Sequence, residues 1–352
     1  MLRRVWIVLL LLAFPAGAGD YAKVIEGAGL EFPRDHGAHP AYRTEWWYVT
    51  GWLDTGDGRE IGFQVTFFRV RPRPSDDNPS RFAPRQILFA HAALADPAAG
   101  RLLHDERVAR AGFGLAEAKE GTTHVWINDW SLVQEGESYR SLIRTGEFSL
   151  DLTLSPTQPL MLQGKSGFSQ KAADARHASH YYSQPHLAVR GTLGRAGRSD
   201  AVSGSAWLDH EWSSEIMPQR AVGWDWVGLN LNDGSALMAF RMRDADGETL
   251  WAGGTLRQRD GEPRVLRPDE VAFVPLRRWR SPRTGATYPT AMRLRAGSLE
   301  VELQPMFDDQ ELDSRRSSGT VYWEGAARAM ESGKEIGRGY LELTGYWKKL
   351  AM

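Results

Sequence analysis

The chain alternates short apolar runs with turn-forming residues, which is the pattern of a protein built from many β-strands. Residues 45–54 are rich in aromatic and β-branched side chains, Asp57 and Gly58 give a turn signal, and residues 61–70 form a second apolar run. This order predicts a β-hairpin. Further strands are predicted at residues 86–94, 123–127, 148–154, 204–208, 236–243, 249–258, 291–295, 299–305, 321–325 and 337–346.

Helical periodicity is scarce along the chain. Helices are predicted only at residues 105–112 and 308–315, and irregular structure is predicted at residues 21–43 and in the proline-rich stretch 71–85. Near the C-terminus the alternation is strict, with Tyr340, Glu342 and Thr344 on one face of a strand. We expect this last strand to be tied into a sheet.

A weak internal repeat suggests two similar units. Residues 46–56 can be aligned with residues 224–234, and each segment is followed by an apolar strand. Chance similarity between two amphipathic hairpins is the alternative. If the repeat is real, each segment opens one barrel unit, and the boundary falls within residues 213–220, which contain Pro218. Many short strands at close spacing favour barrels or sandwiches, so the predicted fold class is all-β.

The first residues have the pattern of a secretory signal peptide. Arg3 and Arg4 precede an apolar run at residues 5–14, which is too short to span a bilayer, and Ala16-Gly17-Ala18 matches a cleavage site. An uncleaved membrane anchor is the alternative. No later stretch reaches the roughly 20 apolar residues that a spanning helix needs. We therefore predict a signal peptide at residues 1–18, no membrane span in the mature chain, and a periplasmic or secreted protein.

Composition narrows the function classes. Lys+Arg (43) and Asp+Glu (44) balance, so nothing favours a nucleic-acid partner. The absence of cysteine excludes disulfides, zinc–thiolate sites, iron–sulfur clusters and thiol nucleophiles. Tryptophan occurs 14 times, and large aromatic side chains both favour strands and line cavities for apolar ligands.

The densest chemical cluster runs from Trp207 to Trp212, where Asp209 and Glu211 flank His210. Carboxylates can raise the pKa of a histidine, and a buried carboxyl can stay protonated, so these residues are candidate acid–base groups. A polar turn at the end of a strand, with its carboxylates capping free N–H groups, is the alternative.

A second cluster lies at the start of the first hairpin. In a strand, Glu45 and Trp47 share one face, and Trp46 and Tyr48 share the other. One of these faces lines the barrel interior. A buried glutamate is costly unless it is paired, so Glu45 lies at the rim or has a function.

A third cluster contains His177, His180 and His186 around the pair Tyr181 and Tyr182. The histidine spacing matches no recognised ligand set, so no metal site is predicted. The tyrosines are better candidates, as hydrogen-bond donors and aromatic faces for a ligand.

His91 lies within a predicted strand and is a further candidate ligand contact, with a satisfied core histidine as the alternative. The chain has no Gly-x-Ser-x-Gly, Gly-x-Gly-x-x-Gly, Walker A or His-Glu-x-x-His motif. A serine hydrolase is therefore the least supported class.

Four motifs together resemble the carotenoid 1,2-hydratase (hydroxyneurosporene synthase) superfamily, and more closely its secreted AttH-like branch of "predicted secreted hydrolases". The motifs are Thr44-Glu45-Trp46-Trp47-Tyr48, Tyr181-Tyr182-Ser183, Trp207-x-Asp209-His210-Glu211-Trp212 and residues 340–346. The resemblance covers nearly the whole mature chain. It implies two tandem lipocalin-like β-barrel domains, which we place at residues 19–217 and 218–352.

The resemblance also implies apolar substrates and chemistry without a cofactor. The hydratases add water to an isoprenoid double bond, related fungal proteins are pericyclic cyclases, and genes of the secreted branch often neighbour export transporters. Hydration needs an acid in a dry pocket, aromatic faces for the cation and a base for water. By resemblance Asp209 or His210 is the acid, Trp212 faces the cation, and Glu45 or Tyr182 orients water.

One departure weakens this transfer. The hydratases carry a tyrosine and an acid downstream, whereas residues 237–243 offer neither.

The sequence thus predicts an exported protein that binds an apolar small molecule in an aromatic-lined cavity and catalyses hydration, cyclisation or isomerisation. The alternative is a non-catalytic periplasmic lipid carrier that serves an export transporter. The predicted catalytic residues are Asp209, His210, Glu211, Glu45 and Tyr182. The predicted ligand-binding residues are Trp46, Trp47, Tyr48, His91, Tyr181, Trp207, Trp212, Trp224 and Trp226.

Overall fold

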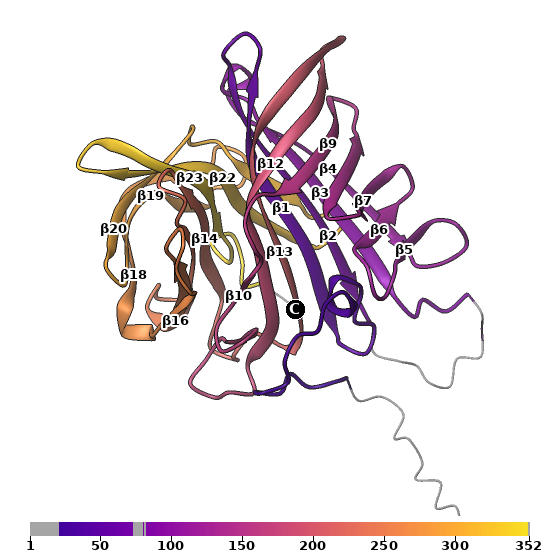
Figure 1. The fold of residues 1–352 in the computed structure, drawn as a ribbon, viewed down its shortest axis with the longest axis horizontal. Coiled ribbons are helices and arrows are strands. Elements are labelled where there is room, and N and C mark those ends of the chain that lie inside the picture. Colours follow the sequence, from indigo (N-terminus) through magenta and orange to yellow (C-terminus); the bar gives the residue numbers. More distant parts are fainter. Residues whose placement is uncertain (1–20, 73–79, 81, 351–352) are drawn as a thin grey trace, which may run out of the picture.

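The computed structural model describes residues 21–72, 80 and 82–350, and strands are the main regular structure of this part of the chain (Figure 1). The predicted signal peptide lies outside the described residues. Two antiparallel sheets divide the chain, and the chain passes from the first to the second between residues 215 and 223. The predicted all-β, double-barrel fold is confirmed.

Helical structure in the described residues is limited to three single turns, η1 (Arg34–His36), η2 (Pro97–Ala99) and η3 (Pro268–Glu270). No helix among the described residues has the length and apolar character to cross a membrane.

The first sheet has the strand order β4-β3-β2-β1-β13-β12-β9-β8-β7-β6-β5, and the short strands β10 and β11 pair with β12. Its strands are β1 (Thr44–Thr55), β2 (Glu60–Val70), β3 (Ile87–Ala95), β4 (Leu102–Arg110), β5 (Ala116–Ala118), β6 (His124–Ile127), β7 (Trp130–Glu135), β8 (Ser138–Arg144), β9 (Phe148–Pro156), β10 (Met161–Leu162), β11 (Phe168–Gln170), β12 (Ala178–Arg195) and β13 (Arg198–Glu215).

The second sheet has the order β17-β16-β15-β14-β23-β22-β20-β19-β18, with β21 paired to β22. It curls until β15 and β16 approach β18, which makes a nearly closed barrel, the orange and yellow part of Figure 1. Its strands are β14 (Gly223–Leu231), β15 (Ala236–Arg243), β16 (Thr249–Arg257), β17 (Arg264–Leu266), β18 (Val271–Arg280), β19 (Thr287–Ala296), β20 (Leu299–Pro305), β21 (Glu311–Ser314), β22 (Thr320–Glu331) and β23 (Lys334–Leu343).

The two sheets repeat one topology. β1 opens the first sheet and pairs with β2 and with that sheet's last strand, β13. β14 opens the second sheet and pairs in the same way with β15 and the last strand, β23. The aligned segments 46–56 and 224–234 begin in these two opening strands, so the sequence repeat reflects a structural one.

Both helix predictions are wrong. Residues 105–110 belong to β4, which pairs along its length with β3, and residues 311–314 form β21, which pairs with β22. Both segments are short and polar, so their intrinsic preference is weak. The backbone hydrogen bonds offered by a neighbouring strand decide their structure.

Apolar side chains form three clusters, one inside each sheet and one between the sheets. β1 shows why, because Trp47 and Val49 point into the first core while Tyr48 and Trp52 point toward the second sheet. From the second sheet, Trp226 is one of the residues that meet them. The layer between the sheets is therefore lined by residues that face away from both barrel cores.

Candidate functional site

The alternation of β13 separates residues that the sequence places side by side. His210 and Trp212 point into the first barrel, where Trp212 belongs to the core cluster. Asp209 points the other way, into the layer between the sheets, where it contacts Tyr181. The predicted catalytic residues therefore occupy two separate places, one inside the first barrel and one between the barrels.

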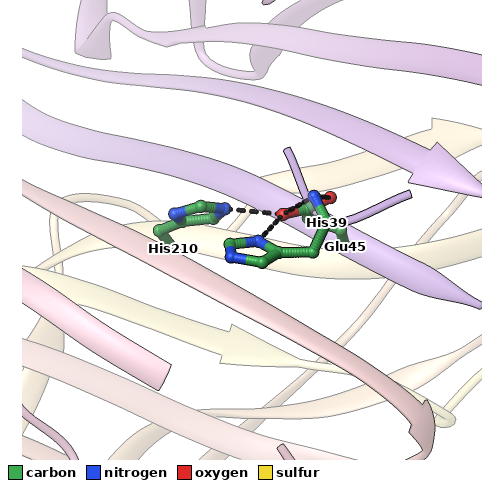
Figure 2. A group of neighbouring side chains, drawn as sticks. All are labelled: His39, Glu45 and His210. Atoms are coloured by element: carbon green, nitrogen blue, oxygen red, sulfur yellow. Dashed lines mark hydrogen bonds and ion pairs between the residues drawn. The ribbon is translucent and has the colours of Figure 1, made fainter. Parts of the chain in front are cut away.

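Glu45 is the centre of the group inside the first barrel, and its side chain has no exposed surface. Arg69, opposite it on β2, donates through Nε to Glu45 Oε2 at 2.7 Å. Figure 2 shows the two imidazoles that converge on Oε1, His39 Nδ1 at 2.7 Å and His210 Nε2 at 2.9 Å. Side chains from β1, β2, β13 and the irregular segment before β1 thus meet at one carboxylate.

Hydrogen bonds extend from both imidazoles. His39 Nε2 lies 3.2 Å from Asp35 Oδ1, and His210 Nδ1 lies 3.2 Å from the Tyr182 hydroxyl. The same hydroxyl is 3.1 Å from His36 Nδ1. The chain of contacts ties the segment at residues 35–39 across the end of the first barrel.

The pKa values of this group follow from burial and pairing. Burial opposes ionisation of Glu45, but hydrogen bonds from His210 and His39 and the charge of Arg69 hold its pKa well below the usual range. Burial lowers the pKa of His210 to about 4. For His39, hydrogen bonds to Asp35 and Glu45 outweigh burial and raise the pKa. A carboxylate paired with Arg69 and His39 is therefore the stable state.

His39, Glu45 and His210 offer nitrogen and oxygen atoms within 4.8 Å of one another, so we tested whether they fit a metal ion. Tetrahedral zinc with bonds of about 2.0–2.1 Å would keep its ligands roughly 3.3 Å apart. The contacts of 2.7 and 2.9 Å are instead hydrogen-bond lengths, and Oε1 also accepts the backbone N–H of His39 at 3.1 Å. The geometry is that of a saturated hydrogen-bond network.

A cavity of about 390 Å³ lies between the two sheets. Its wall is largely apolar and aromatic, and it includes side chains from both sheets. Aromatic side chains on the wall are Trp46, Tyr48, Phe68, Phe89, Trp224, Trp226, Phe240 and Tyr322. A concave, mainly apolar space with a few polar groups is the usual form of a small-molecule site.

Five carboxyl groups line this cavity, and burial raises the pKa of three of them, Asp209, Glu324 and Glu342. The pKa of Asp209 rises to about 7, even though Tyr181, Ser183 and Trp207 donate hydrogen bonds to it at 2.7, 2.5 and 2.7 Å. The pKa of Glu324 rises to about 8. Glu342, which lies opposite Glu324 on the neighbouring strand, has a pKa raised well above its usual value, chiefly by burial.

A hydrogen-bond chain that passes through His91 ends beside Glu324. The Ser317 hydroxyl donates to Glu106, so Ser317 Oγ accepts from His91 Nε2 at 2.9 Å. Burial lowers the pKa of His91 to about 3, so the ring is neutral and Nδ1 accepts from the Tyr322 hydroxyl at 2.8 Å. Because the Tyr322 hydroxyl donates its hydrogen bond to His91, its oxygen is left as an acceptor, and an acceptor beside Glu324 favours the protonated carboxyl.

A buried ion pair lines another part of the cavity. Lys171 Nζ lies 2.8 Å from Glu211 Oε1, and the Ser179 hydroxyl donates to the same oxygen. The ammonium also lies 4.3 Å from the ring centre of Phe240. Each group thus has a partner of opposite type, as burial of an ion pair requires.

The predicted site residues divide between these places. Those that line the cavity are Trp46, Tyr48, His91, Asp209, Glu211, Trp224 and Trp226, and Glu45 borders it while its carboxylate belongs to the network of the first barrel. Tyr181 and Trp207 lie behind the cavity wall and hold Asp209. Trp47, Tyr182, His210 and Trp212 belong to the network and core of the first barrel. Of the three clustered histidines, His186 contacts the Ser235 carbonyl and His180 contacts aromatic rings, so they do not converge.

Sequence reasoning missed several residues of the site, chiefly Glu324, Glu342, Tyr322 and Arg69. The only local signal for the two glutamates is that each follows a tyrosine by two residues and so shares a strand face with it, Tyr322 with Glu324 and Tyr340 with Glu342. A glutamate in such a pattern usually marks the solvent face, and here that face is covered by the other barrel.

The fold and the cavity define a two-barrel, lipocalin-like protein with a largely apolar hollow between its barrels. The chain belongs to the AttH-like family, whose model matches residues 23–346. It is similar to an AttH homologue of Nitrosomonas europaea, NE1406, with 51% identity over 93% of this chain and 100% of that one, and a TM-score of 0.87. The resemblance predicted from the motifs is confirmed.

A more distant solved structure shares the fold. Kievitone hydratase from Nectria haematococca is 16% identical, covers 93% of this chain and 96% of its own, and gives a TM-score of 0.68. No curated protein matches the sequence.

Proposed function

We propose that the cavity between the barrels binds an apolar unsaturated molecule and that Glu324 protonates it, in a hydration or cyclisation that uses no cofactor. The single observation that carries the proposal is a fully buried carboxyl group on the wall of a largely apolar, aromatic cavity, where burial raises its pKa to about 8. The fold shared with kievitone hydratase supports the same class of chemistry.

The proposed reaction balances within the cavity. Glu324 gives its proton to one alkene carbon, which leaves a carbocation on the other carbon and a carboxylate on Glu324. The rings of Trp46, Trp224 and Trp226 line the cavity and can stabilise the cation through their π-faces. Water then bonds to the cation and loses a proton to the carboxylate, which regenerates the acid. In a cyclisation, a second alkene bonds to the cation instead of water, and the new carbocation loses a C–H proton to the carboxylate, which regenerates the acid.

This assignment changes the proposed roles of two residues. His210 faces the first barrel and has a lowered pKa, so we no longer propose it as the acid. Asp209 lines the cavity, but its carboxyl already accepts three hydrogen bonds. We therefore propose that it contributes to the electrostatic potential at the ligand and does not transfer a proton.

Proton transfer can be tested with a panel of geraniol, farnesol and kievitone in heavy water. Mass spectrometry should detect products that have gained one water or one carbon-bound deuterium. Glu324→Gln should lower the rate by at least about 100-fold, the lower end of the usual contribution of a general acid. Glu26→Gln, which changes an exposed glutamate, should leave the rate unchanged.

An unchanged rate in Glu324→Gln would remove Glu324 from the mechanism. Binding of the panel without any product would instead favour the alternative, a carrier that serves an export transporter without catalysis.

We also propose that the protein is exported, on the signal-peptide pattern of residues 1–18. Expression in a bacterium followed by fractionation should place it in the periplasm, with Gly19 as the first residue. A full-length protein in the cytoplasm would refute this.

A further inference from the structure

Lys171 is the one buried lysine in the described part of the chain, and it lies on the wall of the cavity between the sheets. It follows β11 and is 4% exposed, whereas the other lysines of the chain are exposed. It shares the cavity wall with Glu211 on β13 and Phe240 on β15. The cavity therefore contains a buried amine that the proposed acid chemistry does not use.

The neighbours of this amine hold it in place. Lys171 Nζ lies 2.8 Å from Glu211 Oε1 and donates to Ser169 Oγ at 3.0 Å. The ring centres of Phe240 and Tyr181 lie 4.3 and 5.0 Å from Nζ. The amine thus has an acid–base partner at hydrogen-bond distance and aromatic rings around it.

A lysine at this position differs from the usual choice in this protein. The other buried Lys or Arg side chains of the described residues are all arginines, namely Arg69, Arg241, Arg243 and Arg257. Arginine suits a structural buried ion pair, because its planar group forms several hydrogen bonds and keeps its charge. Lysine, by contrast, can give up a proton and then act as a nucleophile. Covalent chemistry at the cavity wall would require the lysine, whereas an ion pair alone would not.

We propose that Lys171 forms a reversible imine with the ligand, so that the substrate class is an apolar aldehyde or ketone. The inference rests on the proposed function only in assuming that the cavity takes an apolar ligand, and it assigns no role to Glu324. Glu211 lies where it can accept a proton from the amine and serve as the counter-ion of the product.

The proposed step balances without any further reagent. Glu211 accepts a proton from the ammonium, which frees the lone pair of Nζ to bond to the carbonyl carbon. Through Glu211, the carbonyl oxygen then collects two protons of the amine and leaves as water, while the nitrogen forms a C=N double bond. The iminium keeps the third proton and the positive charge, and Glu211 is again a carboxylate.

The site already has the charges that the product needs. The iminium carries its charge on the same nitrogen as the ammonium, so Glu211 can neutralise both. The Ser179 hydroxyl donates to the same Glu211 oxygen and supports its negative charge. An iminium buried without such a partner would be costly.

The cavity also limits the size of the ligand. A volume of 390 Å³ holds about 13 groups the size of a water molecule, at roughly 30 Å³ each. Cinnamaldehyde, an aromatic ring joined to a conjugated aldehyde, is within this limit. Cinnamyl alcohol has the same carbon skeleton and cannot form an imine, so it measures binding alone.

The test mixes wild-type protein with cinnamaldehyde and then adds sodium borohydride, which reduces an imine to a stable secondary amine. Mass spectrometry of the intact chain should show a single adduct, whose added mass is that of the aldehyde less one oxygen atom. Peptide mapping should place the adduct on Lys171, and this assignment needs no variant.

Variants then test the roles of the two residues. Lys171→Arg keeps a cation beside Glu211 but cannot form an imine, so it should abolish the adduct and still bind cinnamyl alcohol. Glu211→Gln removes the proton acceptor and should slow adduct formation by at least about 100-fold. Lys165→Arg is the matched control, because Lys165 is exposed, pairs with Glu26 and lies outside the cavity wall. It should leave the yield unchanged.

The outcomes separate this inference from the proposed function. Binding of cinnamyl alcohol, measured by titration calorimetry, without any adduct from cinnamaldehyde on Lys171 would overturn the inference and leave an apolar ligand site intact. An adduct of equal yield in Lys171→Arg would also overturn it. Failure of both compounds to bind would overturn the inference and count against the proposed function as well.

Discussion

Replacing Glu45 by glutamine tests the network that closes the first barrel. The substitution keeps the shape of the side chain and removes its charge. It leaves Arg69, whose side chain is 2% exposed, without the carboxylate that it contacts at 2.7 Å. The glutamine also changes the atom that His39 and His210 share. In place of a carboxylate oxygen, the two imidazoles meet either a neutral amide oxygen or an NH₂ group.

The size of the effect follows from this geometry. Breaking a buried ion pair by removing one partner costs about 3–5 kcal/mol, because a buried charge stays uncompensated. No cavity is created, so the loss is electrostatic. For a barrel of this size a loss of 1 kcal/mol lowers Tm by about 2–4 °C. We therefore expect Tm to fall by about 6–20 °C.

Thermal and urea unfolding followed by tryptophan fluorescence would measure the loss. Glu147→Gln, which breaks an exposed ion pair with Arg101, should lose less than about 1 kcal/mol. Arg69→Met and the double variant complete a cycle, in which the double loss should be smaller than the sum of the single losses. A Glu45→Gln protein within 1 kcal/mol of wild type, or strictly additive losses, would refute the reasoning.

The same network predicts a pH dependence. The pKa of Glu45 is lower in the folded than in the unfolded chain, so its stabilising contribution is present above about pH 4.3 and is lost as the pH falls. The gap between wild type and Glu45→Gln should narrow in acid.

Two further predictions concern the cavity and the sheet packing. The pKa of Glu324 is raised to about 8, so its contribution to stability is present below its unfolded pKa of about 4.3 and is lost as the pH rises through 8. Tm measured at pH 5 and pH 9 should therefore fall less in Glu324→Gln than in wild type, and an equal fall would show that Glu324 is not held protonated. Gly339→Ala would place a Cβ atom 1.8 Å from the Gly228 carbonyl oxygen, and should lose about 1–3 kcal/mol or more in urea unfolding. Gly56→Ala, where the added atom meets open space, is its control, and equal stability of the two variants would contradict the close approach.

Much of the architecture could be predicted because its signals are local. The hairpin of residues 45–54 and 61–70 appears as β1 and β2, and the tryptophan-rich repeat appears as two opening strands with the same neighbours. Alternation along a strand and turn residues between strands act over a few residues, so they can be recognised without knowing the partner strand.

The site could be predicted only in part. The sequence identified Asp209 and His210 as ionisable groups beside tryptophans, but the strand predicted there ended at residue 208, so it did not place them on opposite faces. It did not indicate that both sides of β13 are buried, one by the first barrel and one by the second. For the same reason the sequence did not mark Glu342 as a site residue. A glutamate on a strand usually faces water, but here the first sheet covers that face of β23.

The sequence by itself determined the strands, the turns, the repeat and the family, since these depend on neighbouring residues. Only the tertiary structure decided which groups meet and which keep their protons. Tyr48 and Glu324 approach the same cavity because two sheets pack against each other, and the pKa of Glu324 rises because that packing removes water from around it. Burial and long-range contact are properties of the packed chain, so no local pattern specifies them.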